Sequence, residues 1–157
     1  MLTLASGQHR DLLSTEASID TVPRLDYYQQ LAHAKAGPLF ALAFAGTAIL
    51  VTDDDTIITA CRFLGDVYGA LLQLGDDLHD HKSQITYLGL TLHKAYAETA
   101  DQLTVDHIVD DGAVWEYWKH VYAAYRANVD MVLSQINDAQ FQTAMSRIFD
   151  AAFGRHT

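Results

Sequence analysis

The sequence predicts an all-α protein, a single helical domain over residues 1–157, and two observations carry this prediction. Strands need alternating apolar and polar residues or short β-branched runs between turns, and the chain has almost none. Its apolar residues instead recur at intervals of three and four, which is the spacing along one face of a helix. We therefore expect a bundle of about six helices.

The first two helices are expected on either side of a polar stretch, Thr15–Arg24. The first runs from about Leu2 to Ser14, and the second runs from about Leu25 to Leu50. Gly37 and Pro38 lie in the middle of the second helix. Because proline has no backbone N–H to donate, we expect a kink or a break there.

A third helix is expected from about Asp55 to His81. Its apolar stripe broadens toward the C-terminal half, which predicts a central helix buried on most sides. The acidic run at residues 53–55 stands at its start. Carboxylates favour the positive end of the helix dipole, so this run predicts a turn and helix capping rather than metal binding.

Three more helices complete the predicted bundle, at about Tyr87–Gln102, Ala113–Ile136 and Asp138–Phe153. Residues 110–112, an Asp-Asp-Gly run, predict the turn before the fifth helix, and Asn137-Asp138 predicts the cap of the sixth. No repeat, linker or charge run divides the chain, which supports one domain.

Composition excludes several classes of function. The net charge is −10, and 10 scattered lysines and arginines make no basic patch for nucleic acid. The apolar run Pro38–Val51 is shorter than the roughly 20 residues of a bilayer span, and no basic region opens the chain as in a signal peptide. The single cysteine, Cys61, permits no internal disulfide. We expect a cytoplasmic protein without a membrane span.

An acidic cluster near the end of the third helix is the best candidate for chemistry. Asp76 and Asp80 lie four residues apart on one helix face, with Asp77 beside them. Carboxylates this close repel one another, and they oppose the dipole at a helix C-terminus. Mg²⁺ prefers oxygen ligands and bridges carboxylates to phosphate oxygens. The cluster therefore predicts a Mg²⁺ site, which would also let an acidic chain bind a phosphorylated ligand.

The histidines beside this cluster leave two alternatives open. His79-Asp80 could be the central pair of an HD-type metal phosphohydrolase, with His33 and Asp106 completing the site. His79 and His81 could instead bind a transition metal. However, residues two apart point about 200° apart on a helix, so these two do not share a site.

Four elements, in order along the chain, resemble the trans-isoprenyl diphosphate synthases, or polyprenyl synthetases. The resemblance covers roughly Leu2 to Leu103, and it implies the C-terminal half of the isoprenoid synthase fold. The elements are a GQxxD-like run Gly7-Gln8-His9-Arg10-Asp11, a helix that carries Lys35, a helix with the paired glycines Gly65 and Gly69, and Gln73 followed by Asp76-Asp77-Leu78-His79-Asp80.

This resemblance implies a prenyltransferase that condenses an allylic diphosphate with isopentenyl diphosphate and uses Mg²⁺. It implies that Asp76 ligates the metal directly, with Asp77 and Asp80 in direct or water-mediated support. Lys35 would contact the allylic diphosphate, and Gln8, Asp11 and Gln73 would border the metal and the reacting centre. An apolar tunnel would keep water from the allylic cation. The residues that could line it, or could simply pack in the core, are Phe40, Phe44, Phe63, Tyr68, Leu71 and Leu72.

The chain departs from the family pattern in three places. Ala36 stands where the family has a hydroxyl residue after the lysine. The segment after Asp80 looks like a later family segment with the diphosphate-binding loop deleted, so Lys82 is the candidate for that loop's lysine. The third departure is the first aspartate-rich motif, which the family carries on an earlier helix and this sequence lacks.

The missing motif predicts a partner. We expect a second protein chain to supply the N-terminal helices and the first motif, or the chain to form a homo-oligomer, because a missing half leaves an apolar face uncovered. One alternative is a noncatalytic regulatory small subunit of a heteromeric synthase. Others keep the fold and change the acceptor, as in a relative that prenylates a peptide or a class I terpene cyclase.

Overall fold

The structure is a computed structural model that describes residues 5–7, 9, 25–80 and 111–154. In these ranges the long elements are helices, with no strand among them, so the all-α prediction is confirmed. Residues 5–7 and 9 are helical as well. The predicted helix at Tyr87–Gln102 lies outside the described residues. The four long helices are α2 (Leu25–Ile49), α3 (Asp55–Asp80), α6 (Asp111–Ser134) and α7 (Ala139–Phe153).

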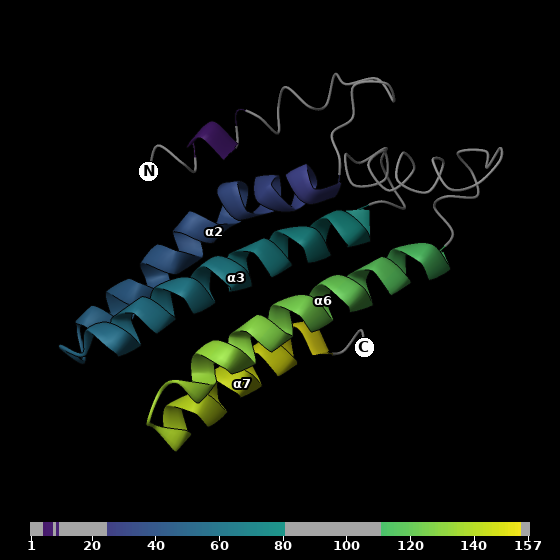
Figure 1. Ribbon diagram of the computed structural model, residues 1–157. Coiled ribbons are helices and arrows are strands. Elements are labelled where there is room, and N and C mark those ends of the chain that lie inside the picture. The colour runs from purple at the N-terminus through teal and green to yellow at the C-terminus, as the bar shows by residue number, and fades with distance from the viewer. Residues whose placement is uncertain (1–4, 8, 10–24, 81–110, 155–157) are drawn as a thin grey trace, which may run out of the picture.

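The helix α3 lies in the middle of the described bundle. Figure 1 shows it between α2 and α6, and α7 folds back beside α6. The helices α2 and α3 run antiparallel and are joined by the short turn at residues 50–54. This arrangement confirms the prediction of a central third helix, and Leu64, Val67, Leu71 and Leu74 of α3 are all buried.

Glycines bring α2 and α3 into close contact. A Cβ added to Gly65 would lie 2.4 Å from the carbonyl oxygen of Phe40. One added to Gly69 would lie 2.8 Å from the carbonyl oxygen of Ala36. Because real side chains essentially never approach a backbone atom this closely, both sites require glycine. These contacts fix how the two helices are aligned along their lengths.

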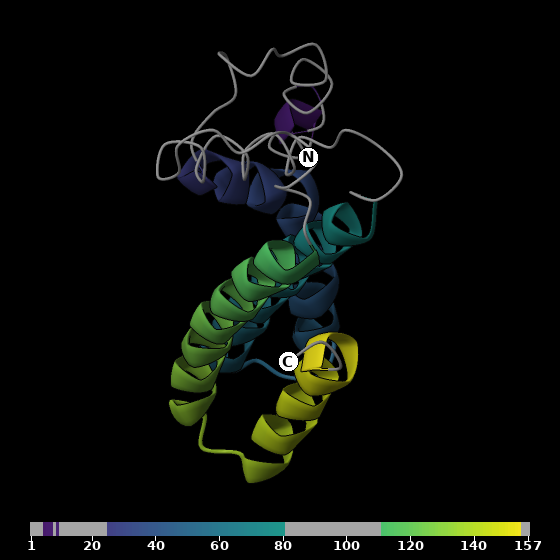
Figure 2. The same ribbon diagram turned by 90° about the vertical axis from the view of Figure 1, so that its right-hand side faces the viewer.

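The helix α2 continues through Pro38 and bends partway along its length, as Figure 2 shows. The predicted kink is therefore present, without a break. Because Pro38 has no N–H, the carbonyl of Ala34 loses its usual helical donor. Gly7 packs against this carbonyl, and a Cβ at Gly7 would lie only 2.5 Å from the Ala34 oxygen. The freed carbonyl is thus the place where the chain's N-terminal segment approaches α2.

Aspartates cap two of the helices, as the sequence predicts. Asp54 precedes α3, and its Oδ1 accepts a hydrogen bond from the Thr56 backbone N–H at 2.8 Å. Asp138 precedes α7, and its Oδ1 accepts from the backbone N–H groups of Gln140 at 2.9 Å and Phe141 at 3.0 Å. Such caps satisfy backbone donors that the first helical turn leaves unpaired.

Aromatic side chains fill the space between α3 and the hairpin of α6 and α7. The ring of Tyr68 lies 5.0 Å from that of Phe153 and 5.7 Å from that of Phe149, measured between centroids. Trp118 of α6 is 2% exposed and packs in the same cluster. Of the residues proposed to line a tunnel, Phe44, Tyr68, Leu71 and Leu72 belong to or pack against this core, whereas Phe63 is exposed.

By length and hydropathy alone, one described helix could cross a membrane. It is the 23-residue stretch Asp55–Asp77 of α3. Half of its most apolar part is buried inside the bundle. Such burial is typical of the core helix of a globular protein.

Candidate functional site

The acidic cluster lies at the C-terminal end of α3, where two neighbouring aspartates have different surroundings. Asp77 is half-buried, and its Oδ1 accepts a hydrogen bond from Gln73 Nε2 at 2.8 Å. Its Oδ2 accepts a hydrogen bond from the hydroxyl of Tyr28 on α2. Asp76 is exposed. Asp77 is therefore held from two sides, whereas the carboxylate of Asp76 faces solvent.

Lys35 lies on α2 and is half-buried. Its neighbour Ala36 packs against Gly69, and Asp76 follows Gly69 by seven residues on α3. At 1.5 Å per residue, Lys35 and Asp76 are about 10 Å apart along the helix axis. Gly7 packs against the backbone here, because a Cβ on Gly7 would lie 2.8 Å from Lys35 N. The start of the GQxxD-like run is thus beside Lys35.

The remaining predicted site residues are not described at side-chain level. Gln8, Asp11 and Lys82 lie outside the described residues, and Asp80 is described only as the last residue of α3. Within the part of the chain that is described, no three His, Cys, Asp or Glu side chains gather as a metal site. The convergence of Asp76 with Asp77 and Asp80 therefore stays a prediction.

Asp76 and Asp77 nevertheless fit the ion that the sequence predicts. Carboxylate oxygens are the ligands that Mg²⁺ prefers, and Mg²⁺ is commonly bound through one or two carboxylates plus substrate phosphates and water. An exposed carboxylate beside an oriented one offers that donor set. In addition, the Gln73 amide and the Tyr28 phenol are uncharged donors, so neither of them neutralises the carboxylate of Asp77.

Tyr28 was not predicted from the sequence. It is 2% exposed, and it contacts Asp77, which is 49 positions further along the chain. A signal for it did exist. Gly65 lies opposite Phe40 in the antiparallel pair, so the same alignment places residue 77 opposite residue 28. Paired glycines on one helix are a sequence signal of close helix contact, and that signal could have indicated this alignment.

A hydrogen-bonded chain that joins three helices was also not predicted from the sequence. His33 Nδ1 on α2 lies 2.8 Å from Asp66 Oδ2 on α3, and His33 Nε2 lies 2.8 Å from the hydroxyl of Tyr125 on α6. Gly37 leaves room for it, since a Cβ there would lie 2.2 Å from Asp66 Oδ1. Both ring nitrogens of His33 have these partners, so His33 does not complete the HD-type metal site considered from the sequence.

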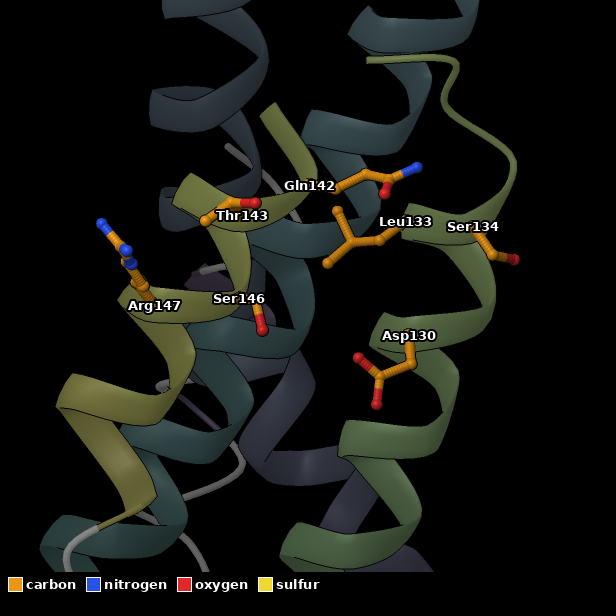
Figure 3. Close-up of a pocket in the computed structure, with 7 residues that line it drawn as sticks. All are labelled: Asp130, Leu133, Ser134, Gln142, Thr143, Ser146 and Arg147. Carbon is orange, nitrogen blue, oxygen red and sulfur yellow. The ribbon is translucent and has the colours of Figure 1, made fainter. Parts of the chain in front are cut away.

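A separate cavity of about 380 Å³ lies between α6 and α7 (Figure 3). Asp130 and Ser146 point into the space between these helices, whereas Arg147 points away from it. Near this cavity Arg126 Nη1 lies 2.9 Å from Asp130 Oδ1, and Arg126 Nε lies 3.3 Å from Asp150 Oδ1. Two carboxylates thus neutralise the guanidinium in a cluster that ties α7 to α6. None of the predicted site residues lines the cavity.

Among the described residues, Cys61 and Tyr122 have shifted pKa values. Burial raises the pKa of the Cys61 thiol, which keeps it protonated and a poor nucleophile. Burial also raises the pKa of Tyr122, and the nearby Asp150 carboxylate adds to this effect while Arg126 opposes it. Neither group lies at the acidic end of α3.

Comparison with known protein families identifies the region that carries this site. Residues 1–98 match the family described as polyprenyl synthetase. Comparisons with curated proteins and with solved structures gave no match. The matched region includes Gly7, Lys35, Gln73, Asp76 and Asp77 and ends before α6. Polyprenyl synthetases bind allylic and isopentenyl diphosphates and generally use Mg²⁺. The chain belongs to the polyprenyl synthetase family, and its function is of the prenyltransferase type.

Proposed function

We propose that this chain supplies the second aspartate-rich motif of a trans-prenyltransferase that condenses an allylic diphosphate with isopentenyl diphosphate. The observation that carries the proposal is the pair at the end of α3. Asp76 is exposed, and Asp77 is oriented by Gln73 and Tyr28. This pair lies in the region that matches the family.

The roles proposed for the chain's own residues follow from charge and position. Asp76 and Asp77 would hold Mg²⁺, with Asp80 and Asp11 in support. The bound ion would neutralise the diphosphate and stabilise it as a leaving group. Lys35 would bind diphosphate oxygens through its ammonium group, about two helical turns, or ~10 Å, from Asp76. Gln8, Gln73 and Lys82 would border the same centre, and apolar side chains would keep water from the allylic cation.

The proposed reaction would need a second cluster of carboxylates besides the one at the end of α3. The DDxxD pattern occurs in the sequence once, at Asp76-Asp77-Leu78-His79-Asp80. A diphosphate that ionises needs its charge compensated from more than one side, which a single motif does not provide. We propose that a second polypeptide supplies the first aspartate-rich motif.

The outer surface of α2 supports the proposal that a partner covers this helix. Five large apolar side chains are exposed along the C-terminal part of α2 and the turn that follows it, although an apolar surface of this kind is usually covered in a stable assembly. From Pro38 to Ile49 the helix has no charged side chain and Thr47 as its one polar residue, so no face of this part is polar. The five residues are Leu39, Leu42, Ile49, Leu50 and Val51.

The experiment is reconstitution. The chain is purified with candidate partners, and Mg²⁺-dependent release of pyrophosphate is measured with each component alone and with both. Asp76→Ala is expected to lower turnover of the complex by about 10²-fold or more, because it removes a direct metal ligand. Asp53→Ala is the matched control, since Asp53 is an exposed aspartate at the opposite end of α3. A well-folded monomer that forms no complex and no oligomer would contradict the proposal.

One observation favours a second candidate function, a noncatalytic regulatory small subunit. Ala36 follows Lys35 where the family has a hydroxyl side chain, so a hydrogen bond near the reacting centre is lost. The same reconstitution separates the two functions. If Asp76→Ala leaves turnover of the complex unchanged while removal of the whole chain lowers it, the chain is a regulator.

A further inference from the structure

We propose that Tyr28 is a positioning residue of the metal centre, which acts by fixing the carboxylate of Asp77. This inference rests on the proposed function, because it concerns the same metal-binding aspartates. Tyr28 lies on α2 and the aspartates lie on α3, so the contact also makes the geometry of the centre depend on how these two helices pack.

The first step is that Tyr28 is itself immobile. Its side chain is 2% exposed and belongs to the main core cluster, together with Leu71, Leu74 and Trp118. A side chain packed on all sides occupies one rotamer, and its hydroxyl then has one location. That hydroxyl donates a hydrogen bond to Asp77 Oδ2. Tyr28 therefore links Asp77 to the rigid centre of the bundle.

The second step is that Asp77 is held at both oxygens. Gln73 Nε2, one turn earlier on α3, donates to Oδ1 at 2.8 Å, and Tyr28 donates to Oδ2. With a donor on each oxygen, the plane of the carboxylate is fixed. The lone pairs that remain then face a constant direction, which is what a metal with strict octahedral geometry requires.

The third step concerns charge, and the α6–α7 hairpin offers the contrast. There Asp130 and Asp150 lie within 3.3 Å of the guanidinium of Arg126, which brings one positive charge to both carboxylates. The phenol of Tyr28 and the amide of Gln73 are uncharged donors. They orient Asp77 without bringing a positive charge to its carboxylate. Hydrogen bonds that orient a metal ligand in this way are commonly worth 10- to 100-fold in metal affinity.

The test measures binding of Mn²⁺, a paramagnetic substitute for Mg²⁺, to the full chain by electron paramagnetic resonance. Tyr28→Phe removes the hydroxyl alone and is expected to weaken Mn²⁺ binding by about 10-fold. Tyr125→Phe is the matched control, because it removes a tyrosine hydroxyl that contacts His33 elsewhere in the same bundle. The Mn²⁺ affinity of Tyr125→Phe should stay within about twofold of wild type. This difference from Tyr28→Phe is expected even if the two variants lose similar thermal stability.

A double-mutant cycle tests whether Tyr28 acts through Asp77. If it does, Tyr28→Phe combined with Asp77→Asn should bind Mn²⁺ as weakly as Asp77→Asn alone, because the hydroxyl then has no metal ligand left to orient. A further tenfold loss in the double variant would overturn the inference. So would wild-type Mn²⁺ affinity in Tyr28→Phe.

Failure of the proposed function has a different signature. In an otherwise wild-type chain, Asp76→Asn should abolish Mn²⁺ binding. If wild-type protein shows no binding that depends on Asp76, the metal site itself is wrong and the role of Tyr28 is overturned with it. If Asp76→Asn abolishes binding and Tyr28→Phe does not weaken it, only the role of Tyr28 is overturned.

Discussion

The central helix α3 packs against its two neighbours in different ways. On the α2 side, contact is made by backbone, with Gly65 against the carbonyl of Phe40 and Gly69 against that of Ala36. On the α6–α7 side, contact is made by large aromatic side chains, such as Tyr68 and Trp118. The family match covers the first interface and ends before the second.

This difference explains which of the two interfaces can hold the groups of a site in fixed positions. Backbone contacts leave no freedom for one helix to slide along the other, so a group on α2 can be aimed at a group on α3. The hydrogen bond from Tyr28 to Asp77 depends on this alignment. An aromatic layer can repack around a substitution at moderate cost. The aspartates therefore stand on the interface whose alignment is fixed by backbone contact.

The largest effect is expected from Trp118→Ala in the aromatic layer. This change deletes a side chain that is 2% exposed and should lower the free energy of unfolding by about 4 kcal/mol, the usual cost of removing a buried aromatic ring. Urea denaturation followed by far-ultraviolet circular dichroism measures it.

Trp118→Phe provides the control for this prediction. Among the described residues the Trp118 indole N–H has no hydrogen-bond partner. Trp118→Phe therefore loses packing contacts and no hydrogen bond. The loss should be about 1 to 2 kcal/mol, which is the cost of a smaller cavity. Equal losses for the two variants would mean that the ring is not packed in the core.

The next effect tests the backbone interface. Replacing a helical glycine by alanine ordinarily stabilises a helix by about 1 kcal/mol. Gly65→Ala should do the opposite, because its Cβ would lie 2.4 Å from the Phe40 carbonyl oxygen. We expect a loss of about 2 to 3 kcal/mol in the free energy of unfolding, as for overpacked cores.

Gly46 of α2 is the matched control, since a Cβ added there meets nothing within 4 Å. Gly46→Ala should raise the free energy of unfolding by roughly 0.5 to 1 kcal/mol. Opposite signs for the two variants are the expected result, and stabilisation by both would show that α2 and α3 are not in backbone contact.

Local sequence signals predicted the helices well, because each depends on neighbours in the chain. The proline bend in α2 and the aspartate caps before α3 and α7 follow from residues within a few positions. The aspartates of the candidate site were found for the same reason, since Asp76 and Asp77 are adjacent. Their roles as metal ligands remain predictions.

Contacts between helices were not predicted, because they depend on how helices align. His33, Asp66 and Tyr125 come from three helices, and nothing near any of them in the sequence indicates the other two. The glycine alignment of α2 with α3 could in principle have indicated the contact of Tyr28. No such signal indicates the contact of Tyr125, because α6 packs through side chains that allow several alignments.

A smaller effect is expected from breaking the chain of hydrogen bonds at His33. His33→Ala leaves Asp66 and Tyr125 without this partner, at sites where the side chains of His33 and Asp66 are 30% and 40% exposed. Water can replace part of what is lost, so we expect a decrease of about 1 to 2 kcal/mol in the free energy of unfolding. His120→Ala on exposed α6 surface is the control and should change it by less than about 0.5 kcal/mol.

The smallest effect is absent at neutral pH and tests the aromatic interface through Tyr122. The folded state raises the pKa of Tyr122 above its ordinary value of 10.0, chiefly through burial and then through Asp150. At lower pH both states keep the phenol proton, so the full stability is present. As the pH rises past 10, the unfolded state loses this proton first, and stability falls. Burial raises the pKa of Cys61 as well, which adds a fall from about its ordinary value of 9.0.

The measurement is urea denaturation between pH 7 and about 11, with Tyr122→Phe and Cys61→Ala as the variants that each remove one titrating group. Tyr122→Phe should flatten the fall above pH 10. In wild type, near-ultraviolet circular dichroism of the aromatic layer should change before the far-ultraviolet signal. Because Tyr122 lies on α6 and belongs to the aromatic cluster, its ionisation should loosen α6 and α7 from α3. Simultaneous loss of both signals would mean that the two interfaces of α3 unfold as one unit, whatever their difference in packing.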